Sequence, residues 1–303
     1  MCGIVGVYDK NIRNKYDVEK EIKMMMSCLA HRGPDESGTF VSERVALGHQ
    51  RLSIIDLTTG RQPIFNEKKT MCITYNGEVY NYRELKKELI VLGHSFSTNS
   101  DTETILHAYE EWGEECVERL RGMFAFGIWD SKKQILFLAR DRLGIKPLFY
   151  SFRNGKLVFA SEIKSILVDS NFTRNINNEA LAAYFMFSYI PSPKTVYDNI
   201  NKLPAGHYLI CKDGRLTEKK YWDLTFKPDR KKKEQDFIHE FMDLFRESVG
   251  LRLISDVPLG AFLSGGIDSS AIVAMMSGQS SYPVNSYTIG FGGNVGSFDD
   301  ERK

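Results

Sequence analysis

The sequence has few of the features that mark disulfide-rich, zinc-finger or membrane proteins. Its five cysteines include no CxxC pair, which argues against a disulfide framework and a cysteine zinc site. The longest apolar run, residues 181–190, is about half of the ~20 residues that a membrane span needs. The opening MCGIVGVYDK lacks the basic leader and long apolar stretch of a signal peptide. We therefore expect a cytoplasmic protein that does not associate with membranes.

An excess of charge of either sign is also missing. Forty basic side chains balance thirty-nine acidic ones and leave a formal net charge of +1, whereas proteins that bind nucleic acid usually carry a clear positive excess. A chain of 303 residues with 42% hydrophobic and 26% charged residues is typical of globular proteins and long enough for about two domains. The composition thus indicates a two-part globular protein without a nucleic-acid partner.

The first part of the chain alternates short strands with helices. Residues 4–8 predict a strand, and apolar residues from Val18 onward recur at helical spacing. Another helix is expected after Asn81, with Glu84 as its capping partner. Its inward residues are expected to be Tyr82, Leu85, Leu89 and Leu92. Hairpins are predicted over 123–140 and 148–160, the latter turning at Asn154-Gly155. This pattern predicts an α+β domain, which we place at residues 2–190.

The sequence changes character at Pro191. Residues 191–233 are polar and proline-punctuated, contain a hairpin turn at Asp213-Gly214 and end in the basic stretch KPDRKKK, which we interpret as a solvated connector. Residues 234–303 predict a helix over 234–249 with Phe237 and Phe241 on its inner side. A strand, a glycine turn, a second helix and a second strand follow. That order is typical of the beginning of a parallel α/β domain, and we expect this domain to be incomplete.

Cys2 follows the initiator methionine directly. Removal of Met1 would leave a thiol nucleophile and a free α-amine on the same residue. Such an amine has a pKa near 7.7, so a useful fraction is neutral at working pH. General-base assistance of this kind contributes on the order of 10²- to 10⁴-fold in rate. Alone, a cysteine at position 2 is a weak signal.

Further motifs accompany Cys2 in a fixed order. They are MCGIVG at 1–6, HRGPD at 31–35, RLSII at 51–55, NGEVYN at 76–81, SDTE at 100–103, GMFAFGIWD at 122–130 and RDRLGIKPLFY at 140–150. Together they resemble the class II, N-terminal nucleophile glutamine amidotransferases over nearly the first two hundred residues. The resemblance implies a four-layer αββα fold of the N-terminal nucleophile hydrolases.

The resemblance also implies roles for individual residues. Cys2 would attack the side-chain amide of glutamine, and Asn76 with the backbone N–H of Gly77 would form the oxyanion hole. Each such donor typically contributes ~3 kcal/mol to the transition state. For Asn76-Gly77, an ordinary hairpin turn stays open as an alternative. We expect His31 and Arg32 to shape the HRGPD loop near the nucleophile rather than to take part in the chemistry.

A second set of residues would bind the glutamine substrate. The resemblance assigns this role to Arg51, Leu52, Ser53, Ile54, Ile55, Asn76, Gly77, Glu78 and Asp101. Arg51 would clamp the α-carboxylate, and Glu78 and Asp101 would hold the α-ammonium. A free amino acid carries one charge of each sign, so its site needs the opposite pair. For Asp101, simple capping of the following helix stays open.

The segment SGGIDSS at 264–270 follows a predicted strand and opens a helix. Backbone N–H groups at such a helix start bind phosphate, but the lysine of the GxxxxGK[ST] P-loop is missing. The segment resembles the pyrophosphate loop of the N-type ATP pyrophosphatases. This implies ATP binding by Leu263, Ser264, Gly265, Gly266, Asp268, Ser269 and Ile289. Mg²⁺ would accompany the phosphates, and no prosthetic group or protein-held metal is expected. A glycine-rich turn capped by an aspartate is the plain alternative.

A glutaminase followed by this loop resembles the glutamine-hydrolysing asparagine synthetases. The resemblance implies glutamine, aspartate and ATP as substrates: ATP adenylates aspartate, pyrophosphate leaves, and ammonia from glutamine displaces AMP. The family's later SGEGxDE-type loop and aspartate-binding residues are missing from this sequence. We therefore expect this chain alone to hydrolyse glutamine, to bind ATP weakly at most and to release no pyrophosphate. A sugar-acid or peptide-carboxylate acceptor, a non-catalytic glutamine-binding module and a homodimer stay open.

Overall fold

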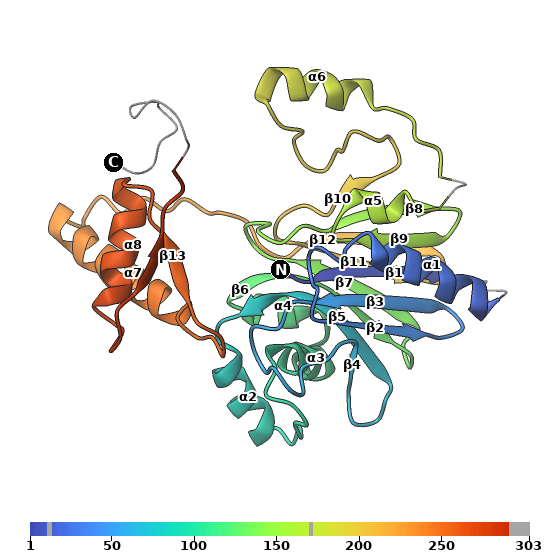
Figure 1. Cartoon of the computed structure of the whole chain (residues 1–303), viewed down its shortest axis with the longest axis horizontal. Coiled ribbons are helices and arrows are strands. Elements are labelled where there is room, and N and C mark those ends of the chain that lie inside the picture. The colour runs from blue at the N-terminus through green and yellow to red at the C-terminus, as the bar shows by residue number, and fades with distance from the viewer. Residues whose placement is uncertain (11–13, 170–171, 291–303) are drawn as a thin grey trace. The chain divides into compact units, whose positions relative to one another are not determined.

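The computed structural model describes residues 1–10, 14–169 and 172–290. The chain separates into two compact units, Met1–Leu224 and Thr225–Lys303, which we describe one at a time (Figure 1). The break after Leu224 lies inside the predicted connector 191–233. The finer domain boundaries stay a prediction.

Two six-stranded sheets form the centre of the first unit. In spatial order, the first sheet consists of β10 (Asn201–Lys202), β8 (Phe149–Arg153), β9 (Lys156–Ala160), β1 (Gly3–Asp9), β3 (Val45–Arg51) and β2 (Glu36–Val41). The second consists of β12 (Arg215–Lys220), β11 (His207–Lys212), β7 (Ile135–Arg140), β6 (Gly122–Asp130), β5 (Met71–Val79) and β4 (Ile64–Phe65). All recorded strand pairs within these two sheets are antiparallel.

Helices accompany these sheets. They are α1 (Lys15–Ser27), α2 (Tyr82–Val91), α3 (Asp101–Trp112), the 3-10 turn η1 (Gly113–Glu115), α4 (Cys116–Arg119), α5 (Ile163–Ile166) and α6 (Asn178–Phe187). Across the described residues of the whole chain, no helix is both long and apolar enough to cross a membrane.

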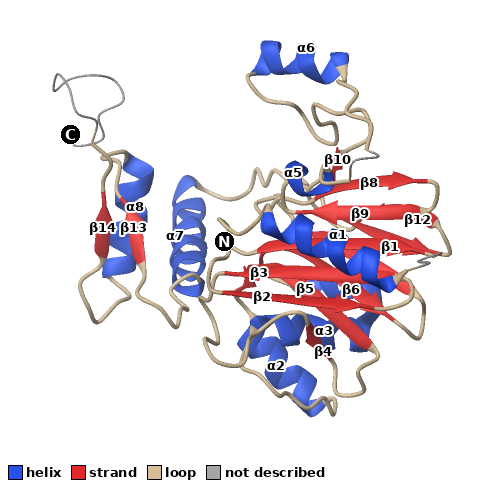
Figure 2. Ribbon diagram, turned by 45° about the vertical axis from the view of Figure 1, so that its right-hand side comes forward, coloured by secondary structure: helices blue, strands red, loops and turns tan. Residues whose placement is uncertain are grey.

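Strand β1 is buried on both faces, and its alternating side chains join two different cores. Ile4 and Tyr8 pack in the cluster between the two sheets. Val5 and Val7 pack in a second cluster that contains apolar residues of α1 and α5. Because successive side chains of a strand point to opposite faces, one short segment joins the sheet–sheet core to the helical layer. The layers are visible in Figure 2.

The second sheet carries α3 on its other face. Tyr109 of α3 stacks on Phe137 of β7, with ring centroids 5.2 Å apart. Ile105 and Leu106 of the same helix are fully buried. The order helix, sheet, sheet, helix confirms the predicted α+β class with its αββα layers.

The start of α2 differs from the prediction. Asn81 precedes the helix but makes no side-chain capping hydrogen bond. Its side chain instead accepts from the backbone N–H of Arg121 (2.9 Å) and donates to the carbonyl of Arg119 (3.0 Å). Leu92, expected to point inward, is about half exposed, because the helix already ends at Val91. The predicted capping pair at Asn81 was therefore wrong: these side-chain contacts tie α2 to the segment before β6.

Residues 201–220 lie within the predicted connector but form strands of the two sheets. β11 pairs with β7 and turns into β12, as expected for the Asp213-Gly214 hairpin. Both turn residues have positive φ, 49° and 72°, a conformation that glycine and aspartate tolerate. This hairpin therefore extends the second sheet.

The second unit begins with α7 (Glu234–Leu251) and continues with β13 (Gly260–Phe262), α8 (Ile267–Ser277) and β14 (Asn285–Tyr287). β13 and β14 pair in parallel, as the strand–helix–strand order predicts. The expected inward face of α7 was wrong, because Phe237 and Phe241 are 46% and 63% exposed. Within residues 225–290, a two-stranded sheet is too small to cover both flanking helices.

We expect Gly6→Ala to destabilise the first unit. A Cβ atom at Gly6 would lie 2.2 Å from Cε1 of Phe159, so the sheet–sheet core must shift, typically at a cost of ~1–3 kcal/mol. Urea unfolding followed by fluorescence measures the change. Val91→Ala, at a position 87% exposed, serves as the control and should be nearly neutral. Equal stability of Gly6→Ala and the parent chain would contradict the described packing.

Candidate glutamine-binding site

Strand pairing brings Cys2 to the end of β3. Gly3, the first residue of β1, pairs with Gln50 of β3, so the preceding Cys2 lies beside the residues that follow β3. Its Sγ is 3.4 Å from the backbone nitrogen and 3.5 Å from the carbonyl oxygen of Leu52. Arg32 donates from Nε to the Cys2 carbonyl (2.9 Å), so the HRGPD loop lies beside Cys2 as expected.

Cys2 opens onto a cavity of about 320 Å³. The cavity is lined by Met1, Cys2, Arg51, Leu52, Ile54, Ile55, Gly60, Gln62, Tyr75, Asn76, Gly77, Glu78, Ser100, Asp101, Thr102, Met123 and Lys146. These residues come from β3, β5, β6 and the start of α3 and from the segments that connect the strands. All residues predicted to hold glutamine line this cavity except Ser53, whose backbone N–H donates to Asp35 (2.8 Å).

Asn76 and Gly77 lie inside β5, not in a turn. A Cβ atom at Gly77 would be 2.2 Å from the carbonyl oxygen of Met123 on the neighbouring strand, so close strand packing requires glycine here. The Asn76 side chain is 1% exposed. Among the described residues, its Nδ2 has no hydrogen-bond partner. A buried amide donor without a partner is costly, and here it lines the cavity that also contains Cys2.

Asp101 is the first residue of α3, but Ser100 caps the helix by accepting from the N–H of Thr102. The Asp101 carboxylate accepts from the Tyr75 hydroxyl (2.7 Å) and from the backbone N–H of Val79 (3.0 Å). Burial raises the pKa of Asp101, and these two donors partly offset the increase. The aspartate is thus held as a buried acceptor facing the cavity, so capping is not its main contact.

Arg51 reaches the cavity from the end of β3. One of its terminal nitrogens donates to Glu36 (2.6 Å). The other donates to the carbonyls of Ile55 (3.3 Å) and Asp56. These acceptors fix a guanidinium that is only 4% exposed. The cavity consequently presents a cation from Arg51 and carboxylates from Glu78 and Asp101, the arrangement that a zwitterion requires.

The environment of Cys2 favours the neutral thiol. Burial raises the pKa of Cys2, and the hydrogen bond with the Leu52 backbone opposes that increase. Burial also lowers the pKa of the α-amine of Met1, which increases its neutral fraction. The Cys2 nitrogen is a peptide amide while Met1 is present, so a general base on this residue forms only once Met1 has been removed.

Several cavity residues escaped the sequence interpretation. Lys146 is 5% exposed, and burial lowers its pKa while Glu78 raises it. Tyr75 precedes the NGEVYN motif and holds Asp101. Gln62 accepts from the Tyr75 N–H (2.7 Å). Lys146 lies within the quoted RDRLGIKPLFY motif, which was the one available signal. The others are ordinary core residues by sequence.

The predicted ATP residues lie together in the second unit. Leu263 and Ile289 follow β13 and β14, and the N–H of Leu263 donates to the carbonyl of Tyr287 (2.8 Å). Gly265 has a φ of +80°, which glycine permits. The hydroxyls of Ser264 and Ser269 are 3.0 Å apart across the loop. The exposed loop therefore ends at the N-terminus of α8, where phosphate would bind.

A separate apolar cavity lies in the same unit. It has a volume of about 370 Å³ and is lined mainly by α7, β13 and α8. None of the predicted ATP residues lines it. It is therefore a gap in apolar packing rather than part of the predicted nucleotide site.

Comparison with protein families agrees with the two units. Residues 1–222 match the family described as glutamine amidotransferase domain, and residues 240–303 match asparagine synthase. The chain is 45% identical over 277 residues to the Bacillus subtilis (strain 168) protein named asparagine synthetase [glutamine-hydrolyzing] 1, covering 91% of this chain and 44% of the relative.

Two further matches widen the comparison. Asparagine synthetase B [glutamine-hydrolyzing] of Escherichia coli (strain K12) is 36% identical over 276 residues, covering 91% of this chain and 44% of that protein. A solved glutamine phosphoribosylpyrophosphate amidotransferase from B. subtilis has a TM-score of 0.53 at 17% identity, covering 95% of this chain and 65% of that one. The solved structure supports the fold. The chain spans less than half the length of both curated relatives.

We expect Glu162→Gln to destabilise the HRGPD loop (31–35), which lies beside Cys2. Burial would raise the pKa of Glu162, but hydrogen bonds from Arg32, Lys164 and His31 lower it from 4.5 to about 2. Its stabilising contribution is therefore present above pH 4.5 and is lost as the pH falls toward 2. Because the carboxylate is partly exposed, we expect a loss of ~1 kcal/mol or less at pH 7.

Urea unfolding of the parent chain and of the Glu162→Gln variant between pH 2 and 8 tests this expectation. The difference in unfolding free energy should be fully present at pH 5 and vanish at the acid end. Glu19→Gln, which removes an exposed helix pair with Lys23, should show almost no difference. If the difference in unfolding free energy between the parent chain and Glu162→Gln grew as the pH fell, the stabilising role of the ionised Glu162 would be wrong.

Proposed function

The chain belongs to the family of glutamine amidotransferase domains, and from this membership we propose that its first unit hydrolyses glutamine to glutamate and ammonia. Cys2 is the nucleophile in this proposal. The observation that carries it is the buried amide of Asn76, which lacks a hydrogen-bond partner among the described residues and lines the same cavity as Cys2. An oxyanion that develops on the substrate would satisfy this donor.

The reaction proceeds in two stages. After removal of Met1, the α-amine of Cys2 takes the thiol proton, and Sγ attacks the amide carbon of glutamine. The tetrahedral oxyanion is held by the Asn76 side chain with the Gly77 N–H. The ammonium form of the amine gives this proton to the leaving nitrogen, so that ammonia leaves. A thioester between Cys2 and the substrate remains on the protein. Water, deprotonated by the same amine, then cleaves the thioester to glutamate and restores the thiol.

Charge complementarity selects the substrate. Arg51 binds the α-carboxylate, while Glu78 and Asp101 bind the α-ammonium. The prior ion pair between Arg51 and Glu36 keeps the guanidinium in place before glutamine arrives, so little side-chain order is lost on binding. Leu52, Ile54 and Ile55 line the apolar part of the cavity.

The family matches of the two units suggest which reaction would use the ammonia. Curated relatives named as glutamine-hydrolysing asparagine synthetases support a role in asparagine synthesis. In this proposal ammonia would displace AMP from aspartate that MgATP has adenylated at the loop 264–270, a step that needs the aspartate-binding residues missing from this sequence. This chain alone hydrolyses glutamine and releases no pyrophosphate. In the same proposal the first domain occupies residues 2–190, the connector occupies 191–233, and residues 234–303 are a partial ATP-binding domain. A cytoplasmic location, a homodimer and the absence of a prosthetic group belong to the same proposal.

Replacement of the nucleophile tests the proposal directly. Cys2→Ala should lower glutamate release from glutamine by ~10³-fold or more, because the covalent route is removed. Cys28→Ala, a half-buried cysteine at the end of α1, should retain activity. Glutamine binding without hydrolysis by the processed parent chain would instead indicate a binding module. Intact mass must accompany the assay, since a retained Met1 blocks the amine.

The acid limb of the pH profile should depend on Tyr75. Asp101 must be ionised to hold the substrate ammonium, and the Tyr75 hydroxyl is one of the donors that lower its pKa. Tyr75→Phe should therefore raise the pKa of Asp101, move the acid limb of kcat/KM to higher pH and raise KM several-fold near neutrality. Tyr82→Phe, which removes a buried hydroxyl on α2, should leave the limb unchanged. An unchanged limb in Tyr75→Phe would reject the role of Asp101.

A further inference from the structure

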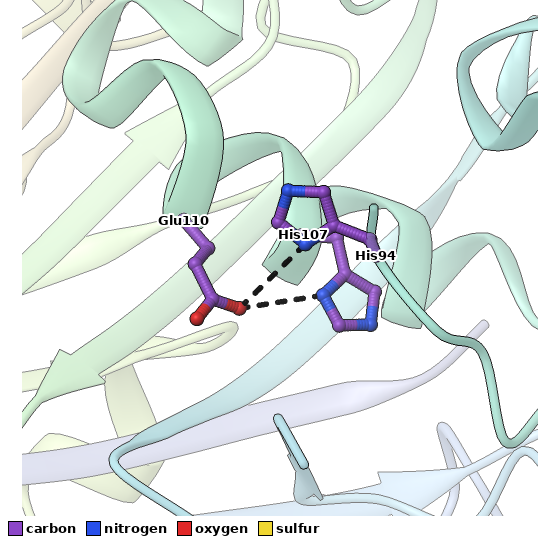
Figure 3. A group of neighbouring side chains, drawn as sticks. All are labelled: His94, His107 and Glu110. Atoms are coloured by element: carbon purple, nitrogen blue, oxygen red, sulfur yellow. Dashed lines mark ion pairs between the residues drawn. The ribbon is translucent and has the colours of Figure 1, made fainter. Parts of the chain in front are cut away.

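Three side chains that could bind a metal ion lie close together at α3. None of them lines the cavity that contains Cys2. They are His107 and Glu110 of α3 and His94, which follows α2 (Figure 3). One oxygen of Glu110, Oε2, is 3.4 Å from Nδ1 of His107 and 3.9 Å from Nδ1 of His94. The three atoms lie within 4.8 Å of one another. In a tetrahedral zinc site, bonds of ~2.0–2.1 Å place ligand atoms about 3.3 Å apart.

These side chains have unused polar atoms in a buried setting. His107 is fully buried. In the described part of the chain, neither of its ring nitrogens has a hydrogen-bond partner, and the same holds for Oε2 of Glu110. The other Glu110 oxygen accepts from Asn66 (3.2 Å), which orients the carboxylate. Burying a polar atom without a hydrogen-bond partner costs free energy. The geometry points to a bound species shared by Nδ1 of His94, Nδ1 of His107 and Oε2 of Glu110.

The outer contacts direct both imidazoles inward. Nε2 of His94 is 3.0 Å from a carboxylate oxygen of Glu111, and Nε2 of His107 is 3.8 Å from a carboxylate oxygen of Glu103. Histidines that bind a metal through one ring nitrogen usually direct the other toward a carboxylate or carbonyl. Both rings therefore present Nδ1 to the same point with carboxylates behind them.

A proton explains this arrangement less well than a metal ion. One proton satisfies a single imidazole–carboxylate pair. The two ring nitrogens converge on one oxygen at distances longer than good hydrogen bonds. With ring centroids 5.0 Å apart, two imidazolium ions would also repel each other.

We propose that His94, His107 and Glu110 bind one divalent transition-metal ion, with Zn²⁺ as the best match to two imidazoles and a carboxylate. Water takes the fourth position. No protein-held metal was expected from the sequence, in which His94 lies on a different segment from His107 and Glu110. The ion links the segment that follows α2 to α3. Glu103 of the same helix already holds the N–H groups of Ser97 (2.8 Å) and Thr98 (2.7 Å).

Zinc titration of the chelator-treated full chain tests the proposal. The Cys2→Ala background is used, since the terminal thiol and amine would otherwise bind zinc themselves. Calorimetry should give one Zn²⁺ per chain, and zinc should raise the Tm. Glu111→Gln, which alters an outer contact, should weaken binding about 10-fold. His94→Gln and Glu110→Gln should each weaken it more than 100-fold.

The controls separate metal binding from folding. His239→Gln removes an exposed histidine of α7 and should bind zinc like the parent. Circular dichroism and the metal-free Tm establish that each variant is folded. Co²⁺ should give the visible absorption of a tetrahedral site in the parent and in His239→Gln but not in His94→Gln. Zinc affinity that is equal in folded His94→Gln, Glu110→Gln and the parent would overturn the proposal, as would less than one zinc per parent chain.

Discussion

The pairing of β1 between β3 and β9 is the constraint on which the site depends. A nucleophile at the second residue of a chain lies where disorder is usually greatest. Here β1 begins at Gly3 and is hydrogen-bonded on both edges, while its two faces lie in different cores. Moving the register by one residue would exchange those faces. The position of Cys2 is thus secured by the burial of the residues that follow it.

Helix α3 connects the cavity with the rest of the first unit. Its first residue, Asp101, faces the cavity, and its buried side packs on the second sheet through Tyr109. The Glu103 carboxylate binds the segment that leads into the helix. The pKa of Glu103 falls to about 2: burial raises it, but the nearby His107 imidazole and hydrogen bonds from Ser97 and Thr98 outweigh that effect. The helix start is therefore held by charge-assisted contacts, and this fixes Asp101 in turn.

Local patterns predicted the elements of this fold better than their contacts. The short apolar run 4–8 indicated β1, and the Asn154-Gly155 turn indicated the β8–β9 hairpin, because both signals depend on neighbouring residues. Asn81 shows the opposite case. Its sequence position suits a helix cap, yet its amide is used by the segment before β6. A long-range partner outcompeted the local one, and nothing near Asn81 announces that partner.

Ordered motifs were enough to predict which residue types the candidate site contains: a thiol at the second residue, charges of both signs for a zwitterion and a carboxamide at Asn76. The folded chain was needed to show that the backbone N–H of Ser53 donates to Asp35 and that Lys146 and Tyr75 line the cavity. It also brought His94 beside His107. The physical reason is that motifs specify side chains along the chain, whereas these contacts arise when two sheets and a helix close around a shared core.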